Sequence, residues 1–175
     1  MPKTISDKIE IIERFVSYVI DEVRNGSIYV RGGQGERGSN INDSYIAKRE
    51  YNDKSQIERV KKTLNKRMNN PIYKRERIGA FDCSGLIVYF FLSYGLLNSD
   101  TTADGLKGKS KHIKREEVRA GDFCCILNSN KKCTHIGVAI DNINCVEARG
   151  RDYGVQLNEI DDRDFNYFCR FDKFV

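Results

Sequence analysis

The stretch that decides the fold covers residues 81–91 and reads Phe-Asp-Cys-Ser-Gly-Leu-Ile-Val-Tyr-Phe-Phe. From Leu86 onward its apolar side chains recur at helical spacing, which predicts a buried helix. Cys83 then lies in the first turn, where free N–H groups and the helix dipole stabilise a thiolate. Either Asp82 or Ser84 can cap this helix. By itself the stretch fits a nucleophile and a packed core cysteine equally well.

The chain has 175 residues, of which 39% are hydrophobic and 31% charged. These values are typical of a soluble globular protein, so we expect one domain over residues 1–175. No apolar run approaches the roughly 20 residues that a membrane helix needs. The first residues lead directly into an amphipathic pattern, and we therefore expect no signal peptide.

The chain has six cysteines: Cys83, Cys124, Cys125, Cys133, Cys145 and Cys169. Their spacing does not resemble a small disulfide scaffold, so we expect reduced thiols. A zinc site would have to use residues of one stretch of the chain: Cys124, Cys125, Cys133 and His135. Because adjacent cysteines are poorly placed to bind one ion, we expect no metal site.

The positive charge of the chain is local. Residues 31–80 hold 13 Lys and Arg against 6 Asp and Glu, while the whole chain carries a net charge of +5. This excess could attract an anionic wall polymer or a nucleic acid, or it could simply be a solvated face. No nucleic-acid-binding motif occurs in the segment, so we do not expect nucleic acid as a partner.

The first half of the chain predicts two clear helices, at residues 5–24 and 53–69, each from apolar residues at helical spacing. We expect the apolar stripe of the first helix to lie in the core. Between the helices, residues 27–33 predict an extended piece that enters a glycine turn. Residues 34–52 are polar and predict an irregular loop. Together, residues 34–78 have the character of a basic, partly helical insertion.

The second half predicts antiparallel strands. Candidate strands cover residues 123–127, 134–140 and 144–148, and residues 155–157 and 167–174 are candidates for a fourth and a fifth. Residues 98–111 are polar, with one helical turn at 102–106. Since helices come first and strands follow, the fold class is α+β with an antiparallel sheet.

A nucleophilic thiol needs a base, and the base needs a group that orients it. His135 begins a predicted strand, and a tight turn at residues 141–142 brings the next strand alongside it. That strand carries Glu147, within reach of the imidazole. Cys83, His135 and Glu147 therefore form a candidate catalytic triad. The alternative is a structural histidine with a surface glutamate.

Five short motifs occur in a recognisable order: Tyr29-Val30-x-Gly32-Gly33, Phe81-Asp82-Cys83-Ser84-Gly85-Leu86, Ala120-Gly121-Asp122-Phe123, Thr134-His135-Ile136-Gly137-Val138-Ala139-Ile140 and Val146-Glu147-Ala148. From about Tyr29 to its end, the chain resembles the NlpC-type (NlpC/p60) cell-wall cysteine peptidases. The resemblance favours Cys83 as a nucleophile.

The resemblance implies a papain-like α+β fold, with the nucleophile helix packed on an antiparallel sheet. It also implies cleavage of peptidoglycan stem peptides, usually between γ-D-glutamate and the diamino residue, without a cofactor. By the same resemblance, Tyr29 lines the site and helps to hold the oxyanion. Asp82 and Ser84 are then expected to bind the amino end of the stem peptide.

Three features depart from the family pattern. Arg31 stands where an aromatic residue is common, and Glu147 stands where His, Asn or Gln is frequent. The connection over residues 34–78 is longer than usual, as in phage-encoded members. We expect synthesis in the cytoplasm and action outside it on the wall, with phage- or prophage-type release as one route. The insertion is expected to aid adsorption to anionic wall polymers and to take no part in the chemistry.

An amidase or acyltransferase that uses the same triad on another acyl compound is the nearest alternative. Circularly permuted relatives that act on lipid acyl groups place the histidine before the cysteine. Here Cys83 precedes His135, which argues against that branch.

Overall fold

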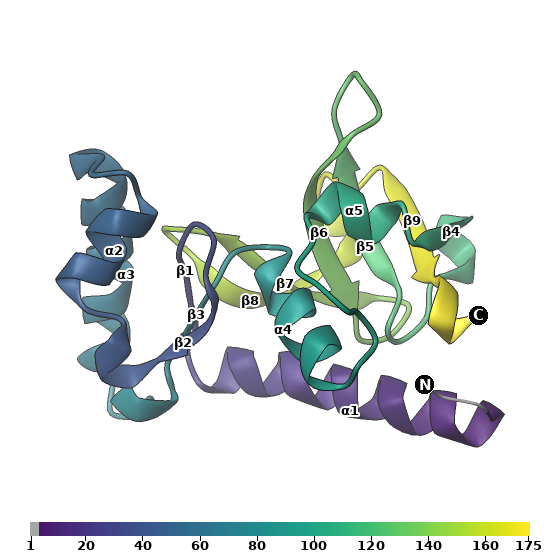
Figure 1. The fold of residues 1–175 in the computed structure, drawn as a ribbon, viewed down its shortest axis with the longest axis horizontal. Coiled ribbons are helices and arrows are strands. Elements are labelled where there is room, and N and C mark those ends of the chain that lie inside the picture. Colours follow the sequence, from purple (N-terminus) through teal and green to yellow (C-terminus); the bar gives the residue numbers. More distant parts are fainter. Residues whose placement is uncertain (1–3) are drawn as a thin grey trace.

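The computed structural model describes residues 4–175, and Met1–Lys3, where a signal peptide would begin, lie outside the described residues. Its α-helices are α1 (Ile5–Arg24), α2 (Asp43–Arg49), α3 (Lys54–Met68), α4 (Gly85–Ser93) and α5 (Ala103–Lys107). Short 3₁₀ turns lie at η1 (Gly38–Asn40), η2 (Arg75–Arg77), η3 (Arg115–Glu117), η4 (Ile160–Asp162) and η5 (Asp172–Phe174). Figure 1 shows α1 running beneath the rest of the molecule, with α2 and α3 at the end opposite β4 and β9.

The strands form two sheets. A three-stranded sheet has the order β1-β3-β2, and a six-stranded sheet has the order β4-β9-β5-β6-β7-β8. Their bounds are β1 (Ile28–Tyr29), β2 (Gln34–Arg37), β3 (Gly79–Phe81), β4 (Ser110–Ile113), β5 (Phe123–Leu127), β6 (Cys133–Ala139), β7 (Asn144–Gly150), β8 (Gly154–Glu159) and β9 (Tyr167–Phe171). All pairs in the larger sheet are antiparallel, so the predicted α+β class is confirmed.

Helix α4 is buried between α1 and the larger sheet. The ring of Phe91 lies 5.0 Å from that of Phe15 on α1, and 4.7 Å from that of Phe171 on β9. This aromatic layer belongs to the main hydrophobic core, which also contains Phe123 on β5. Burying such large rings is worth several kcal/mol in total, and it holds the start of α4 in a fixed place.

Residues 34–78, which we call the basic segment, have a hydrophobic cluster of their own. Val60 and Leu64 on α3 pack with Ile46 on α2, and with Ile28 and Ala80 on the smaller sheet. The segment is therefore anchored on the strands that lead into the glycine turn and into α4. Helix α3 is less exposed than its many charges suggest.

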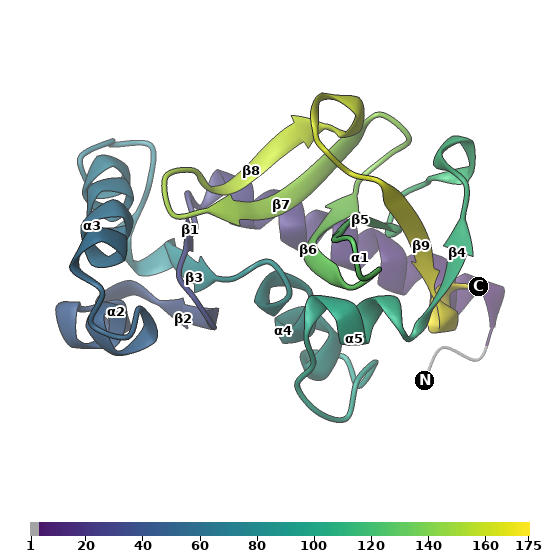
Figure 2. The same ribbon diagram turned by 90° about the horizontal axis from the view of Figure 1, so that it is seen from above.

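Helix α3 also contacts the turn between β7 and β8, and Figure 2 shows that turn reaching toward it. The Thr63 hydroxyl donates to the carbonyl of Arg151 at 2.6 Å. Arg59 pairs with Asp152 at 2.5 Å, also in that turn. The basic segment is thus fastened to the same hairpin that carries Glu147.

Some sequence predictions were wrong in detail. The expected loop at residues 34–52 contains β2 and α2, because Asn42 caps a helix whose only buried apolar residue is Ile46. The polar stretch at residues 98–111 leads into β4, which pairs with β9 at the edge of the sheet. The stripe of α1 lies in the core only in part, since Ile5 and Ile9 are exposed.

No helix within residues 4–175 combines the length and the apolar character that crossing a membrane requires.

Candidate active site

The helix that carries the thiol is capped by Asp82. Its Oδ1 accepts hydrogen bonds from the Gly85 N–H at 2.6 Å and from the Ser84 hydroxyl at 3.2 Å. The carbonyl of Asp82 accepts from the Leu86 N–H at 3.2 Å, as an N-cap carbonyl does. Cys83 therefore occupies the first turn, at the positive end of the helix dipole. Ser84 makes no capping bond of its own to the backbone.

The glycine turn packs directly against this helix start. The Gly32 N–H donates to Asp82 Oδ2 at 3.0 Å, and the Asp82 N–H donates to the Gly33 carbonyl at 3.0 Å. A Cβ atom on Gly85 would lie 2.0 Å from the Gly33 oxygen. Only glycine fits there, which gives a physical reason for the Asp-Cys-Ser-Gly order.

The structure brings Cys83, His135 and Glu147 together. His135 lies on β6 and Glu147 on β7, and the His135 Nε2 lies 2.5 Å from Glu147 Oε2. The Cys83 side chain is near enough to the same imidazole to help raise its pKa. Since Nε2 is occupied by Glu147, the Nδ1 atom is the one left to face the thiol.

Gly137 on β6 leaves room for the side chains of Glu147 and Phe165, which both lie beside His135. A Cβ atom on Gly137 would lie 3.3 Å from the Glu147 Cβ and 3.3 Å from the Phe165 Cζ. The ring of Phe165 stacks beside the imidazole of His135, with centroids 6.2 Å apart. The imidazole is thereby held between a carboxylate and an aromatic face.

Glu147 is fully buried and fully paired. Arg163 donates to both of its oxygens, at 2.5 and 3.2 Å, and the Asn158 amide donates to Oε1 at 2.9 Å. Burial opposes the charge of Glu147, but the hydrogen bonds from His135 and Arg163 outweigh it and lower the pKa of Glu147. A charged carboxylate therefore faces His135 at neutral pH.

The charge on Glu147 also acts on His135. Burial disfavours the imidazolium, but hydrogen bonds to Cys83 and Glu147 outweigh burial and raise the pKa of His135 to about 9. The ring is thus protonated at neutral pH. A protonated imidazole can act as a general acid.

Tyr29 lies on β1 at the same site. Burial, with the neighbouring Cys83 and Asp82, raises the pKa of Tyr29 to about 12, so its hydroxyl stays protonated. Arg151 covers the ring, with its Cζ atom 5.4 Å from the ring centroid. A protonated hydroxyl close to Cys83 can donate a hydrogen bond.

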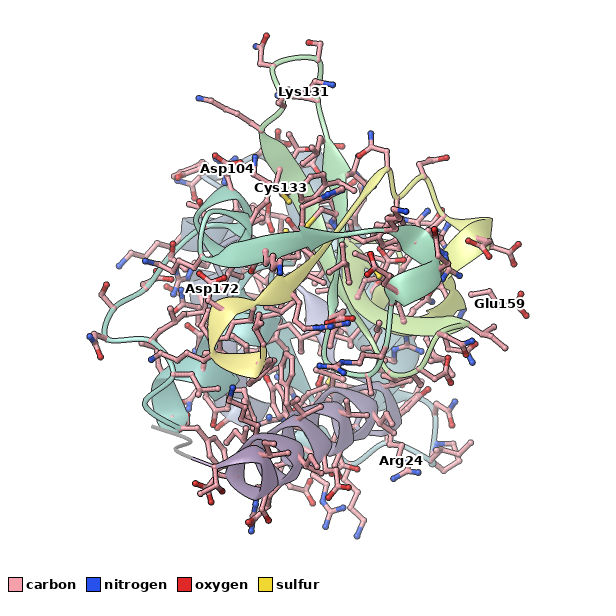
Figure 3. The ribbon with its side chains drawn as sticks, turned by 90° about the vertical axis from the view of Figure 1, so that its right-hand side faces the viewer. Arg24, Asp104, Lys131, Cys133, Glu159 and Asp172 are labelled. Atoms are coloured by element: carbon pink, nitrogen blue, oxygen red, sulfur yellow. The ribbon has the colours of Figure 1, made fainter. Side chains whose placement is uncertain are left out.

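The beginning of β6 is held by a contact outside the sheet. The carboxylate of Asp104 on α5 accepts a hydrogen bond from the Cys133 N–H at 2.8 Å, and Figure 3 shows the two residues side by side. The hairpin between β5 and β6 projects beyond the body, with Lys131 near its tip. Asp104 thus fixes the strand two residues before His135.

A cavity of about 710 Å³ opens beside Asp82. Its lining comes from the glycine turn, from α2 and from the residues around them, and includes Arg31, Gly32, Lys48, Arg49, Tyr51 and Asp82. Ser84 is not part of this lining. Both oxygens of Asp82 already accept hydrogen bonds, Oδ1 within the cap and Oδ2 from the Gly32 N–H, so a substrate amine would have to share them.

All six cysteines are free thiols. Within residues 4–175, no group of three or more His, Cys, Asp or Glu side chains is arranged to hold a metal ion.

Asn158 and Arg163, which hold Glu147, were not anticipated from the sequence. Arg163 follows the short η4 turn, where no periodic pattern places it against β7. Likewise, nothing in the spacing linked Glu50 to Arg151, although they form a buried ion pair at 2.6 Å. One signal was available: a buried glutamate needs a cation or several donors.

Solved structures with the same fold include NlpC/P60 domains. The P60 domain of the M. avium subspecies paratuberculosis antigen MAP1204 is 20% identical with a TM-score of 0.55, and the match covers 91% of this chain and 96% of that chain. RipB, a peptidoglycan hydrolase from Mycobacterium tuberculosis, is also 20% identical, with a TM-score of 0.54 and coverage of 91% and 66%. NlpC2 from Trichomonas vaginalis is 17% identical, with a TM-score of 0.58, and this chain covers 46% of its length.

No curated protein sequence matches the chain significantly. The match to a family model is extensive, however, because the model of the NlpC/P60 family covers residues 26–170. This range begins just before β1 and includes the glycine turn, the start of α4 and the strands that carry His135 and Glu147. The chain belongs to the NlpC/P60 family.

Proposed function

We propose that the protein is a cysteine peptidase that hydrolyses peptidoglycan stem peptides. The observation that carries this proposal is the hydrogen bond from His135 to the buried Glu147, with the Cys83 thiol beside the same imidazole. Family membership and the likeness to a peptidoglycan hydrolase support the substrate class. Within the stem peptide, the γ-D-glutamyl–diamino acid bond is the proposed target.

The first half of the reaction uses the thiolate. The Cys83 sulfur attacks the scissile carbonyl carbon, and the carbonyl oxygen becomes an oxyanion. The Cys83 N–H at the start of α4 has no acceptor within residues 4–175, so it is free to donate to that oxygen. The Tyr29 hydroxyl is a second candidate donor.

The second half returns the enzyme to its starting state. The protonated His135 gives its proton to the leaving amine as the C–N bond breaks, leaving a thioester on Cys83. Neutral His135 then takes a proton from water, which attacks the thioester and releases the acid. Glu147 stabilises the imidazolium in the resting enzyme and in both tetrahedral intermediates.

Product analysis tests this proposal. The protein is incubated with a soluble stem tripeptide, L-Ala-γ-D-Glu-L-Lys, and the products are identified by mass spectrometry. We expect L-Ala-D-Glu and free lysine. Loss of alanine alone, or transfer of the acyl group to an added amine with no hydrolysis, would point to a different acyl chemistry.

A further inference from the structure

The cavity beside Asp82 is built jointly by the catalytic helix and by the basic segment. Asp82 precedes the nucleophile in the sequence, and the opposite wall comes from α2 and the residues after it. The cavity therefore adjoins the residue that immediately precedes the proposed nucleophile.

The charges that line the cavity do not cancel. The lining holds three cations and two carboxylates, which leaves one positive charge in excess. Arg49 is paired with Glu36 at 2.9 Å. The carboxylate of Asp82 accepts hydrogen bonds from the uncharged donors of Gly32, Ser84 and Gly85 and keeps its charge. Arg31 and Lys48 are the two cations outside these contacts. In the described part of the chain, neither forms an ion pair with a carboxylate.

The backbone beside Arg31 is held in an uncommon conformation. Tyr51 and Asn52 follow α2 with φ values of 53° and 59°, a region that residues other than glycine rarely adopt. This conformation places the Tyr51 ring 4.5 Å from the Arg31 Cζ atom. Stacking on one face leaves the N–H edge of the guanidinium available. Strain of this kind is typical of ligand-binding positions.

Arg31 is also tied to the catalytic wall. Its backbone N–H donates to the buried Glu50 at 3.0 Å, and the other Glu50 oxygen pairs with Arg151 at 2.6 Å. Arg151 in turn covers Tyr29, which lies beside Cys83. The wall of the cavity and the wall of the catalytic site therefore form one connected structure.

We infer that this cavity is a subsite that binds a carboxylate on the acyl half of the substrate, through Arg31 and Lys48. The inference rests on the proposed function, because it assumes that a γ-linked glutamyl group reaches Cys83. A γ-linkage leaves the α-carboxylate of the glutamate free, a few carbon atoms from the scissile carbonyl. Guanidinium and ammonium groups are well suited to hold such a carboxylate.

Binding is measured first, so that the result does not depend on turnover. The full chain carrying Cys83→Ala is titrated calorimetrically with L-Ala-D-Glu and with L-Ala-D-isoglutamine, which has an α-carboxamide. We expect the acid to bind about tenfold more tightly or better, as charged hydrogen bonds allow. Equal affinity for the acid and the amide, or binding of neither, would overturn the inference.

Three further variants assign the preference to residues. In the same background, Arg31→Gln and Lys48→Gln should each weaken acid binding several-fold while the amide affinity changes by less than about twofold. Lys66→Gln removes one charge from the basic segment outside the cavity and should leave both affinities unchanged. If Lys66→Gln weakens acid binding as much as Arg31→Gln does, the preference comes from the overall positive charge of the basic segment, and the subsite is refuted.

A hydrolysis assay then tests the subsite and the proposed function independently of each other. The wild-type protein is assayed on L-Ala-γ-D-Glu-L-Lys and on its α-carboxamide counterpart. Cleavage of both with equal kcat/KM would leave the proposed function standing and refute the subsite. Cleavage of neither, with the acid preference intact in binding, would refute the proposed function and support the subsite.

Discussion

Two charged regions lie on either side of Cys83, and they differ in how their charges are balanced. On the side of the larger sheet, Glu147 is fully buried and is bound by His135, Asn158 and Arg163. In the basic segment, cations outnumber carboxylates, and none of these cations is buried. In the first region the buried charge is bound by side chains of the protein itself. In the second, some cations have no such partner among the described residues and are available to a ligand.

This difference separates two ways in which charge can contribute to function. A buried, fully paired carboxylate has little freedom to move, so it can set the protonation state of a neighbour. Exposed cations are screened by salt and act on association more than on chemistry. The two regions should therefore respond differently to mutation, to pH and to salt.

The largest effect is expected at Cys83. Cys83→Ala should lower hydrolysis of a soluble stem peptide by roughly 10⁴-fold or more, because no other described side chain can replace the nucleophile. The fold should be kept, since Cys83 is only half-buried. Product formation and circular dichroism are measured on the same preparation. A folded variant that retains wall-lytic activity would exclude Cys83 as the nucleophile.

The next largest effect is expected at Glu147. Glu147→Ala removes a charged hydrogen bond worth about 1.5–3 kcal/mol, which corresponds to roughly ten- to a hundred-fold in kcat/KM. Glu147→Gln keeps an acceptor but removes the charge, so its cost should be smaller. Both variants are compared with the wild type on one soluble substrate.

The pH dependence gives these variants a second readout. In the wild type the pKa of His135 is raised to about 9, so kcat/KM should fall as pH rises through about 9. Removing the negative charge of Glu147 destabilises the imidazolium, and the alkaline limb should then move to lower pH. If all three pH profiles superimpose, another group orients His135.

A smaller effect is expected at Arg163, which does not touch the thiol. Arg163→Gln should lower kcat/KM by about tenfold, because Glu147 loses a charged partner that fixes its position. Removing this cation favours the imidazolium, so the alkaline limb should not move to lower pH, in contrast to Glu147→Gln. The pH profile of kcat/KM distinguishes the two variants.

Arg170 provides a matched control, because it pairs with the buried Asp122 at 2.8 Å in another part of the sheet. Arg170→Gln should destabilise the fold to a similar extent and leave the pH profile unchanged. If Arg170→Gln alters catalysis as much as Arg163→Gln, the effect of Arg163 comes from stability alone.

The smallest effect on catalysis is expected from the exposed lysines of α3. Lys62→Gln with Lys66→Gln should weaken adsorption to purified cell walls, and the difference from the wild type should shrink as salt rises. Turnover of a soluble tripeptide should change by less than about twofold. Cosedimentation with walls and the tripeptide assay provide the two measurements. A parallel loss in both would place α3 in the active site.

The sequence predicted the parts of the molecule that depend on local pattern. The helical spacing in residues 5–24 and 53–69 anticipated α1 and α3, and the alternating strands with their tight turns anticipated β5 to β9. The proximity of His135 to Glu147 also followed from local order, since one short turn separates their strands.

Contacts made by isolated residues could not be predicted in this way. Helix α2 has a single buried apolar residue, Ile46, so its spacing carried almost no signal. Strand β4 is polar because it lies at a sheet edge, and edge strands show weak alternation. Arg163 reaches Glu147 from a short turn, and Glu50 reaches Arg151 across 101 positions of sequence. These pairs depend on tertiary packing that no local pattern encodes.

The measurement that tests the account most directly is the intact mass of the acyl-enzyme. The wild-type protein is mixed with excess L-Ala-γ-D-Glu-L-Lys, quenched in acid within milliseconds to seconds, and analysed by mass spectrometry with peptide mapping. We predict a thioester adduct with the mass of the L-Ala-D-Glu acyl group on the peptide that contains Cys83, absent from Cys83→Ala. Hydrolysis that continues at full rate without this adduct, and persists in Cys83→Ala, would contradict the account.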